Sequence, residues 1–452
     1  MTVFDQKRLT GVDFGFDMDA IRRGYYADKY FVNIQHILGG IAQDAKTYKD
    51  FGGQSPRELP LDPSELAIGD LEVEAQIFNR RKPYTVVAGV DAALAMLKRG
   101  TGYFDGEQFV PTWQNLTVEA VPDGVFTHYE GDPMNIQPVI VVRGRYRDFT
   151  VLETTLLGVL SRASRIATNV CDLLAVTNGK PLLFFPARFD MPSVQSIDGY
   201  AYWVAVQRHN ADTGRDLKPY VSTDAQGAWW GARGGGTLPH SLIASFLADT
   251  VATMVAFAEY IPVSVPRTVL ADFNNDTVQA SLATMAAYWP RYVQALQADD
   301  REGQARWTLS GVRLDTGGTM VDVSLQPNGK TGVNEDLVWT VRRALDGAWQ
   351  AWDVPATLQE AAQAYCRNVS IIVSGGFNRD KIERFEQAGV PVGSYGVGSS
   401  LFSNESSLGT NTDFTMDVVQ VKLGDQWQPI AKLGRQPCNN PDLMPVDLSQ
   451  LD

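Results

Sequence analysis

PRTVLADFNND (residues 266–276) predicts a short buried strand that ends in a polar turn. Its apolar residues suit a strand covered on both faces, and a helical pattern follows from about 278 to 298. The same alternation recurs along the chain, so the sequence predicts an α/β fold with a parallel sheet or barrel. Further strands are expected at 182–185, 309–315, 369–374 and 392–396, and further helices at 334–350 and 379–388.

Polar residues or glycines follow each of these strands. The endings are ADFNND (271–276), RLDTGG (313–318), SGGFN (374–378) and YGVGSS (395–400). The carboxyl ends of barrel strands converge on one mouth, where active sites are built. We therefore expect the following residues to meet in space: Asp272, Asn274, Asp276, Arg313, Asp315, Ser374, Gly375, Gly376, Gly396 and Gly398.

The residue types at these strand ends indicate a class of ligand. Glycines let backbone N–H groups approach a phosphate closely, and carboxylates beside a phosphate suit Mg²⁺ or sugar hydroxyls. The pattern thus favours a phosphorylated sugar or a nucleotide. No general base, nucleophile or reaction type follows from this pattern alone.

Other segments predict helices and strands in the rest of the chain. Residues 24–38 have apolar positions at helical spacing, residues 68–147 contain short β-type runs, and residues 151–175 predict a long apolar helix. From about residue 412 the sequence alternates apolar and polar residues, as in antiparallel strands.

Composition excludes several classes of protein. The 452 residues carry a net charge of −13, which argues against a surface that coats nucleic acid. Three cysteines form neither a disulfide framework nor a zinc ribbon. The opening MTVFDQKRL lacks the apolar region of a secretory signal, so we expect a cytoplasmic protein. Asp249 and Glu259 interrupt the apolar stretch 242–265, which predicts a buried core helix rather than a membrane span.

Two further segments carry candidate residues with open interpretations. His240 follows the glycine-rich stretch GARGGGTLPHSLI (231–243) and opens the long apolar helix. It either simply starts this helix or carries a phosphate near its ring. Arg188, in LLFFPARFD (182–190), forms an ion pair or binds a carboxylate or phosphate, while Phe185 is core or stacks on a flat ring.

These segments together resemble the nicotinate phosphoribosyltransferase family, within the type II phosphoribosyltransferases that include the nicotinamide enzyme. The resemblance implies an irregular, TIM-like α/β barrel at 148–402 and an N-terminal α/β sandwich domain at 1–147. A C-terminal segment at 403–452 would pack its strands back on the N-terminal domain, and the protein would form a homodimer or a higher homo-oligomer. The motifs that carry the resemblance, in chain order, are ADKYF (27–31), GRYRDFTVLETTLLGVLSRAS (144–164), FFPAR (184–188), GTLPHSLI (236–243), VLADFNND (269–276), GVRLDTGG (311–318), VSGGFN (373–378) and YGVGSSL (395–401).

The resemblance also implies a role for each matching residue. Tyr30 and Phe185 would stack on a pyridine ring, Arg188 would hold its carboxylate, and His240 would be phosphorylated by ATP. Asp272 and Asp315 would bind Mg²⁺ and, with Arg313, the pyrophosphate of phosphoribosyl pyrophosphate. Four glycines would form the backbone cradle of the 5′-phosphate: Gly375, Gly376, Gly396 and Gly398. Ser374 and Ser399 would be further substrate-binding residues.

The implied activity is an enzyme of NAD biosynthesis and salvage. It would join nicotinate to phosphoribosyl pyrophosphate, giving nicotinate mononucleotide and pyrophosphate, with ATP as co-substrate and Mg²⁺ as cofactor. No zinc, nucleic-acid partner or membrane association is expected.

Four departures from the family pattern keep alternatives open. Pro186 and Phe189 replace a glycine and a second arginine, Phe273 replaces a small hydroxyl residue, and Gly318 replaces a second carboxylate. One alternative is the same reaction on nicotinamide or another base. Another is a non-catalytic relative that binds phosphoribosyl ligands, and a third is an unrelated phosphosugar enzyme on a barrel.

Overall fold

The computed structural model describes residues 8–404 and 411–451, and most of the MTVFDQKRL opening lies outside this part. By their contacts the residues form two units, each with its own sheet. Unit 1 comprises residues 1–171, 196–214 and 402–452, and unit 2 comprises residues 172–195 and 215–401. The predicted boundary at 147 precedes the long helix, whereas the contacts keep residues 148–171 with unit 1.

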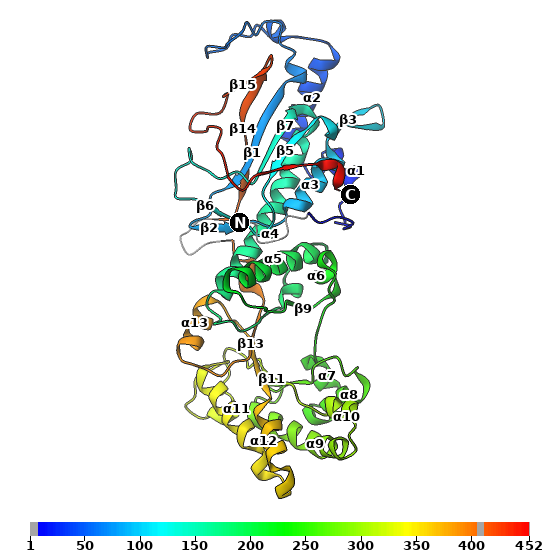
Figure 1. Cartoon of the computed structure of the whole chain (residues 1–452), viewed down its shortest axis with the longest axis vertical. Coiled ribbons are helices and arrows are strands. Elements are labelled where there is room, and N and C mark those ends of the chain that lie inside the picture. The colour runs from blue at the N-terminus through cyan, green and yellow to red at the C-terminus, as the bar shows by residue number, and fades with distance from the viewer. Residues whose placement is uncertain (1–7, 405–410, 452) are drawn as a thin grey trace. The chain divides into compact units, whose positions relative to one another are not determined.

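Unit 1 contains a six-stranded sheet in the order β15-β14-β1-β7-β5-β16. The C-terminal strand β14 pairs antiparallel with β1, which joins the tail to the N-terminal half of the sequence (Figure 1). Two separate strand pairs, β2 with β6 and β3 with β4, complete the strands of this unit. The strands are β1 (Glu72–Asn79), β2 (Tyr84–Val86), β3 (Gly102–Asp105), β4 (Gln108–Pro111), β5 (Thr117–Ala120), β6 (Phe126–His128), β7 (Ile140–Arg145), β14 (Phe414–Leu423), β15 (Gln426–Gln428) and β16 (Met444–Val446).

Helices pack against this sheet through a shared apolar core. Ile77 of β1 and Val142 of β7 lie in one cluster with Leu94 and Leu160, which belong to two helices. The first of these helices was not expected from sequence: β2 ends at Val86, and the left-handed Gly89 (φ 89°) then starts a helix. The helices are α1 (Met18–Arg22), α2 (Lys29–Gln43), α3 (Val90–Gly100), α4 (Glu153–Leu174) and α5 (Gln195–Thr213).

Unit 2 contains the parallel sheet that the sequence predicts. Its order is β10-β11-β12-β13-β8-β9, and every pairing between these strands is parallel. The α/β fold class is therefore confirmed, and the six strands form a half-barrel sheet with β10 and β9 at its edges. A closed TIM-like barrel and an N-terminal sandwich stay predictions. The strands are β8 (Leu182–Phe184), β9 (Tyr220–Val221), β10 (Thr268–Leu270), β11 (Gly311–Leu314), β12 (Ser370–Val373) and β13 (Ser394–Val397).

Polar caps start the helices that follow these strands. The side chains of Asp276, Asn334 and Asn378 each accept a hydrogen bond from a backbone N–H in the first turn of a helix. The polar strand ends thus serve partly to begin helices. The helices are α6 (Asp224–Gly227), α7 (His240–Ser245), α8 (Thr250–Tyr260), α9 (Thr277–Gln297), α10 (Arg301–Arg306), α11 (Glu335–Gly347), α12 (Gln359–Arg367) and α13 (Arg379–Gln387).

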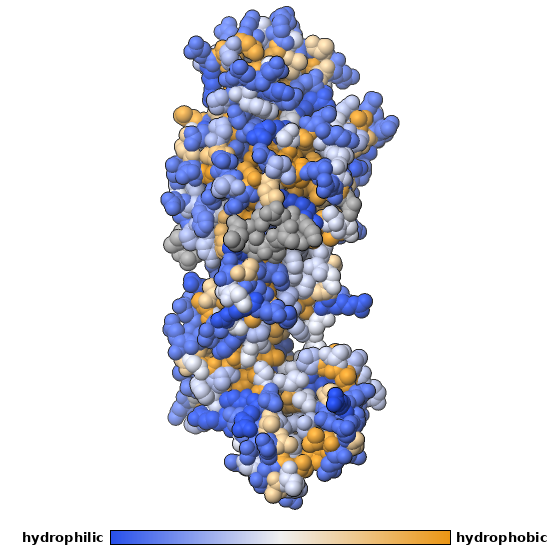
Figure 2. Space-filling view, viewed as in Figure 1, coloured by the Kyte–Doolittle hydropathy of each residue, from blue (hydrophilic) through white to orange (hydrophobic). Residues whose placement is uncertain are grey.

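The prediction of a single long helix at 242–265 is wrong. The chain instead forms α7 and α8, separated by Leu247 and Ala248 with positive φ. Asp249, read as an interruption of a helix, caps α8 by accepting a hydrogen bond from the Ala252 N–H at 2.9 Å. No helix among the described residues has the length and apolar character needed to cross a bilayer. Figure 2 shows hydrophilic residues over much of the visible face, with apolar residues between them.

Candidate active site

His240 and Asp272 form a hydrogen-bonded pair in unit 2. Nε2 of His240, at the start of α7, lies 3.0 Å and 3.1 Å from the two carboxylate oxygens of Asp272, just after β10. The imidazole is 45% exposed and the carboxylate 9%. A carboxylate at one ring nitrogen orients the imidazole and leaves Nδ1 as the nitrogen directed to other partners.

Arg313, Asp315 and Ser374 form a second connected group. Arg313 donates from Nε to Oγ of Ser374 at 2.9 Å and from Nη2 to a carboxylate oxygen of Asp315 at 3.1 Å. Ser374 Oγ donates to the other carboxylate oxygen of Asp315 at 2.8 Å. Since Arg313 lies on β11 and Ser374 directly follows β12, adjacent parallel strands bring these residues together.

The charge of Asp315 in the second group acts on the pKa of Asp272 in the first. Burial raises the pKa of Asp272, His240 opposes the rise, and the negative charge of Asp315 adds to it. Strand ends from β10 and β11 thus place two carboxylates within electrostatic reach, beside one histidine and one arginine.

One glycine turn and the glycine-containing end of β13 lie next to this group. Gly375 (φ 87°) and Gly376 (φ 69°) adopt left-handed backbone conformations, and both are exposed. A hydrogen bond links the segment after β13 to the segment after β12: Ser400 Oγ donates to the carbonyl oxygen of Phe377 at 3.0 Å. A Cβ on Gly396, in β13, would lie 3.3 Å from that of Ser374, so β13 neighbours the end of β12 at this point.

Phe185 presents a ring at the same strand ends. The Arg313 guanidinium lies 5.2 Å from its centroid, and Tyr220 meets it edge to face at 6.3 Å. A Cβ on Gly396 would come within 2.6 Å of the Phe185 ring, so only glycine leaves room for this ring position. An aromatic ring, a cation and a carboxylate therefore lie in one group.

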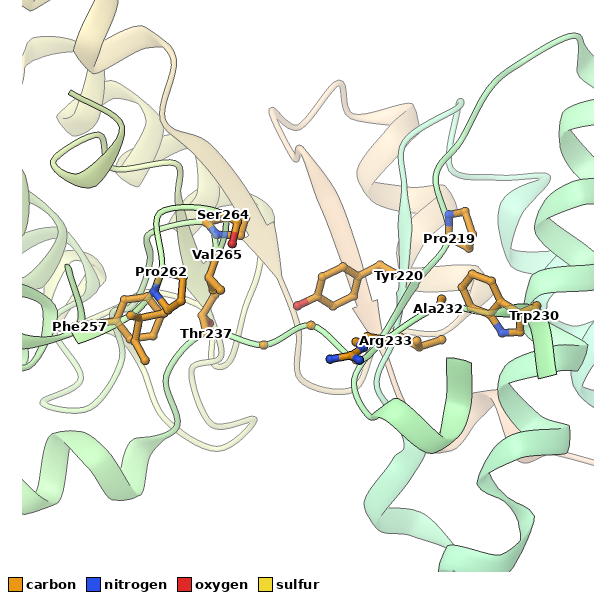
Figure 3. A pocket seen from close by; sticks show the side chains of 16 residues that line it. Pro219, Tyr220, Trp230, Ala232, Arg233, Thr237, Phe257, Pro262, Ser264 and Val265 are labelled. Atoms are coloured by element: carbon orange, nitrogen blue, oxygen red, sulfur yellow. The ribbon is translucent and has the colours of Figure 1, made fainter. Parts of the chain in front are cut away.

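A cavity of about 580 Å³ adjoins Tyr220. Figure 3 shows Tyr220 pointing across it, from the side of Arg233 and Trp230 toward the side of Thr237. The glycine-rich segment 234–236 and the segment 261–266 also line the cavity. Tyr220 lines the cavity and also meets the Phe185 ring, whereas Asp272, Arg313 and Asp315 are not among the lining residues.

The buried Arg267 is hydrogen-bonded to a segment that lines one side of this cavity. Its guanidinium donates to the carbonyl oxygens of Pro262 at 2.8 Å and Ile261 at 2.7 Å. These contacts fix the connection between α8 and β10, which carries lining residues.

Several predicted site residues lie elsewhere or serve other contacts. Arg188 is exposed and its guanidinium lies 5.3 Å from the centroid of the Phe189 ring, and a Cβ on Gly398 would also meet Phe189. Asn274 donates to the carbonyl oxygen of Ala248 at 3.0 Å, and Asp276 caps α9. Ser399 is exposed and lies two residues beyond the end of β13.

Tyr30 lies in unit 1, on α2. It is 59% exposed, and its hydroxyl donates to Asp28 at 3.1 Å. Asp28 is in turn anchored by its backbone N–H, which donates to Oγ1 of Thr154 on α4. The stacking of a ring between Tyr30 and Phe185 stays a prediction.

Sequence reasoning missed Tyr220 and Lys381. Tyr220 belongs to a strand of only two residues, too short for a periodic signal. Lys381 lies in the first turn of α13 and reads as a surface residue, yet its Nζ donates to the carbonyl oxygen of Gly375 at 3.3 Å. Its proximity in sequence to SGGFN was the one signal that could have pointed to it.

Asp272 and Asp315 fit the requirements of a magnesium ion. Mg²⁺ is usually bound through one or two carboxylates together with substrate phosphates and water. The described residues bring together no group of three or more His, Cys, Asp or Glu that could hold a metal by themselves. The donor set therefore suits an ion that arrives with a phosphorylated substrate.

Comparisons with known proteins agree with this architecture. Residues 62–164 match the family described as quinolinate phosphoribosyl transferase, N-terminal domain. A nicotinate-nucleotide pyrophosphorylase from Pyrococcus furiosus has a similar structure, at 24% identity and a TM-score of 0.60 over 93% of this chain and 80% of that one. Human nicotinic acid phosphoribosyltransferase matches at 17% identity and a TM-score of 0.50, over 89% of this chain and 75% of that one.

The resemblance to type II phosphoribosyltransferases inferred from the motifs is thereby confirmed. The family match covers part of unit 1, and the two structures extend the likeness in fold over most of the chain.

Proposed function

We propose that this protein is a phosphoribosyltransferase that joins nicotinate to phosphoribosyl pyrophosphate, coupled to ATP through a phosphohistidine. The products are nicotinate mononucleotide and pyrophosphate. The observation that supports this most is the group at the ends of β10, β11, β12 and β13, where two carboxylates, Arg313, the Gly375–Gly376 turn and Gly396 lie together. A phosphorylated sugar with an anionic leaving group needs these elements: backbone N–H donors, a cation and metal-binding oxygens.

Positive charge near the leaving pyrophosphate stabilises the negative charge that it gains. Its bond to ribose C1 breaks with the electron pair going to pyrophosphate, and positive charge develops on the ribose ring. Arg313 neutralises the departing oxygens, while Asp315 orients the ribose hydroxyls or stabilises the ring charge. Mg²⁺ bound through Asp272 and Asp315 would supply further charge neutralisation of the pyrophosphate.

The pyridine base requires a flat surface beside C1. Phe185 offers one ring face, with Tyr220 edge-on, and Tyr30 is proposed as the opposing aromatic. The pyridine nitrogen then forms the new bond to C1 from the face opposite the leaving group. Holding both substrates in this orientation lowers the barrier by removing the entropy cost of their encounter.

His240 is the proposed acceptor of the ATP γ-phosphoryl group. Asp272 engages Nε2, so we assign Nδ1 as the nitrogen that attacks phosphorus, with ADP leaving. The phosphohistidine adds negative charge beside Asp272 and can couple ATP hydrolysis to substrate binding.

Quinolinate is the second candidate base, because residues 62–164 match a quinolinate phosphoribosyl transferase domain. With quinolinate, transfer also releases CO₂ and gives the same mononucleotide. Two hypotheses compete with transfer to either acid: nicotinamide as the base, and a role that binds phosphoribosyl ligands without catalysis.

A base panel tests the proposal. The protein is incubated with Mg²⁺, phosphoribosyl pyrophosphate and one of nicotinate, nicotinamide or quinolinate, with and without ATP, and mononucleotide and pyrophosphate are measured by mass spectrometry. We expect nicotinate to give the highest kcat/KM and ATP to raise it. Preference for another base would reassign the substrate, and binding without turnover of any base would favour the non-catalytic role.

Gly396→Ala should weaken binding of the base. The added Cβ would overlap the Phe185 ring at 2.6 Å, so the ring must move from its place beside Arg313. We expect a loss of about 1–3 kcal/mol in the free energy of unfolding, as for other overpacked sites, and a KM for the base raised about tenfold. Gly158→Ala on α4 is the matched control, because its Cβ meets nothing within 4 Å. Equal behaviour of the two variants in thermal unfolding and in KM would contradict this placement of Phe185.

A further inference from the structure

We propose that Tyr220 is a positioning residue that couples the glycine-rich segment before His240 to the Phe185 ring. The inference rests on the proposed function, in which His240 takes a phosphate and Phe185 holds the base. It starts from two contacts of the Tyr220 ring, which meets Phe185 edge to face at 6.3 Å and packs against Gly235.

The contact between Tyr220 and Gly235 leaves no space for a side chain on the glycine. A Cβ on Gly235 would lie 2.7 Å and 2.8 Å from two carbons of the Tyr220 ring and 2.9 Å from its hydroxyl oxygen. The N–H of Gly235 donates to the carbonyl oxygen of Val221 at 2.8 Å, which attaches the segment to β9, the strand that carries the ring. Figure 3 shows the Tyr220 hydroxyl directed toward the stretch of chain between Arg233 and Thr237. A shift of this segment therefore acts directly on the ring.

A second set of contacts joins the segment to the Phe185 loop. A Cβ on Gly234 would lie 2.6 Å from backbone atoms of Thr223, whose hydroxyl donates to Oε1 of Gln195 at 2.8 Å. Gln195 in turn donates from Nε2 to the carbonyl oxygen of Ala187 at 3.3 Å, two residues after Phe185. These contacts fix the spacing of the two backbones, so the tyrosine ring that touches both parts has little room to avoid a shift.

The Phe185 ring is confined on its other sides. A Cβ on Gly396 would lie 2.6 Å from this ring, and the Arg313 guanidinium lies 5.2 Å from its centroid. Burial raises the pKa of Tyr220 and the positive charge of Arg313 opposes the rise, so the tyrosine is within electrostatic reach of the same cation. A displaced Tyr220 thus changes the position of a ring that lies beside the cation proposed to face the pyrophosphate.

The glycine-rich segment leads directly to His240. Four residues separate Gly235 from His240, and the last of them, Pro239, has a restricted backbone that transmits a shift rather than absorbing it. A phosphate on His240 adds negative charge beside the carboxylate of Asp272, and the two repel each other. We therefore expect phosphorylation to move the start of α7 and the segment before it, and the tyrosine ring to pass this movement to the ring that holds the base.

Steady-state kinetics with and without ATP test the proposal. KM for nicotinate and kcat are measured with the full chain, Mg²⁺ and saturating phosphoribosyl pyrophosphate, and the coupling ratio is KM without ATP divided by KM with ATP. Tyr220→Leu should bring this ratio to within about twofold of one and raise KM without ATP about three- to tenfold, with kcat within about threefold of wild type. Radiolabelled ATP should still phosphorylate the variant. Tyr220→Phe should keep the wild-type ratio, because the ring that makes both contacts remains.

Gly235→Ala perturbs the same contact without altering Tyr220. The added Cβ would displace the ring, so this variant should also lose the coupling ratio. Gly236→Ala is the matched control, because its Cβ would meet nothing within 4 Å. Tyr260→Leu is the control for loss of a tyrosine, since this residue at the end of α8 is 84% exposed. Both controls should keep the wild-type ratio.

Three outcomes would overturn this role of Tyr220. A wild-type coupling ratio in Tyr220→Leu and Gly235→Ala would overturn it and leave the proposed transfer reaction standing. Loss of phosphorylation in Tyr220→Leu would also overturn it, because the substitution would then act on His240 itself. If ATP left KM of the wild-type protein unchanged, the proposed ATP coupling and this inference would fall together.

Discussion

Arg313→Met should lower kcat/KM for phosphoribosyl pyrophosphate by about 10³, as expected when a preorganised charge that faces a leaving group is removed. Arg313 joins Asp315 and Ser374 through two hydrogen bonds and lies against the Phe185 ring. Its loss therefore removes a cation and the two hydrogen bonds that hold Asp315 and Ser374. Arg313→Lys should restore only part of the rate, because an ammonium group cannot reproduce both bonds of the guanidinium fork.

Steady-state release of pyrophosphate measures this effect, with thermal unfolding as the check on folding. Arg343→Met is the matched control, because this exposed arginine of α11 donates to the carbonyl oxygen of Trp339, one turn earlier on the same helix. We expect the control to keep wild-type kinetics. A rate for Arg313→Met within about threefold of wild type, which is under 1 kcal/mol, would remove Arg313 from the mechanism.

His240→Ala should abolish both phosphorylation of the protein by ATP and stimulation of the reaction by ATP. A slow reaction without ATP should survive, because the groups around Arg313 and the glycine turns remain. The phosphorylated wild-type protein should carry its phosphate on Nδ1, since Nε2 faces Asp272 at 3.0 Å. Radiolabelled ATP measures the incorporation, and NMR of the denatured phosphoprotein distinguishes the two ring nitrogens.

Two further variants sharpen this test. Asp272→Asn should slow phosphorylation, because the amide holds the imidazole less strongly than the carboxylate does. His128→Ala, at an exposed position of β6, should behave like wild type. Full ATP stimulation in His240→Ala, or phosphate on Nε2, would refute the assigned role of this histidine.

Much of unit 2 is predictable because short apolar strands carry a strong local signal. The runs at 266–272, 309–315 and 369–374 contain β10, β11 and β12, and Arg313, Asp315 and Ser374 at the ends of β11 and β12 are joined by hydrogen bonds. The pairing of His240 with Asp272 could not be read in the same way. It joins residues 32 positions apart, and its geometry depends on where α7 begins after the glycine-rich segment.

Other features had no local signal at all. Asp249 suits either a helix interruption or a cap, and only the backbone around Leu247 distinguishes them. The partner of β14 lies more than 330 residues away on β1, so its register depends on the assembled sheet. Lys381 donates to the carbonyl oxygen of Gly375 in a neighbouring turn, a contact that the sequence pattern of a helix does not reveal.

A crystal structure of the protein with phosphoribosyl pyrophosphate and Mg²⁺ tests the central claim most directly. We expect the 5′-phosphate on the turns at Gly375–376 and Gly396–398, and the pyrophosphate beside Arg313 with the metal at Asp272 and Asp315. A ligand bound well away from these strand ends, or held without contact to Arg313 and either glycine turn, would contradict the account.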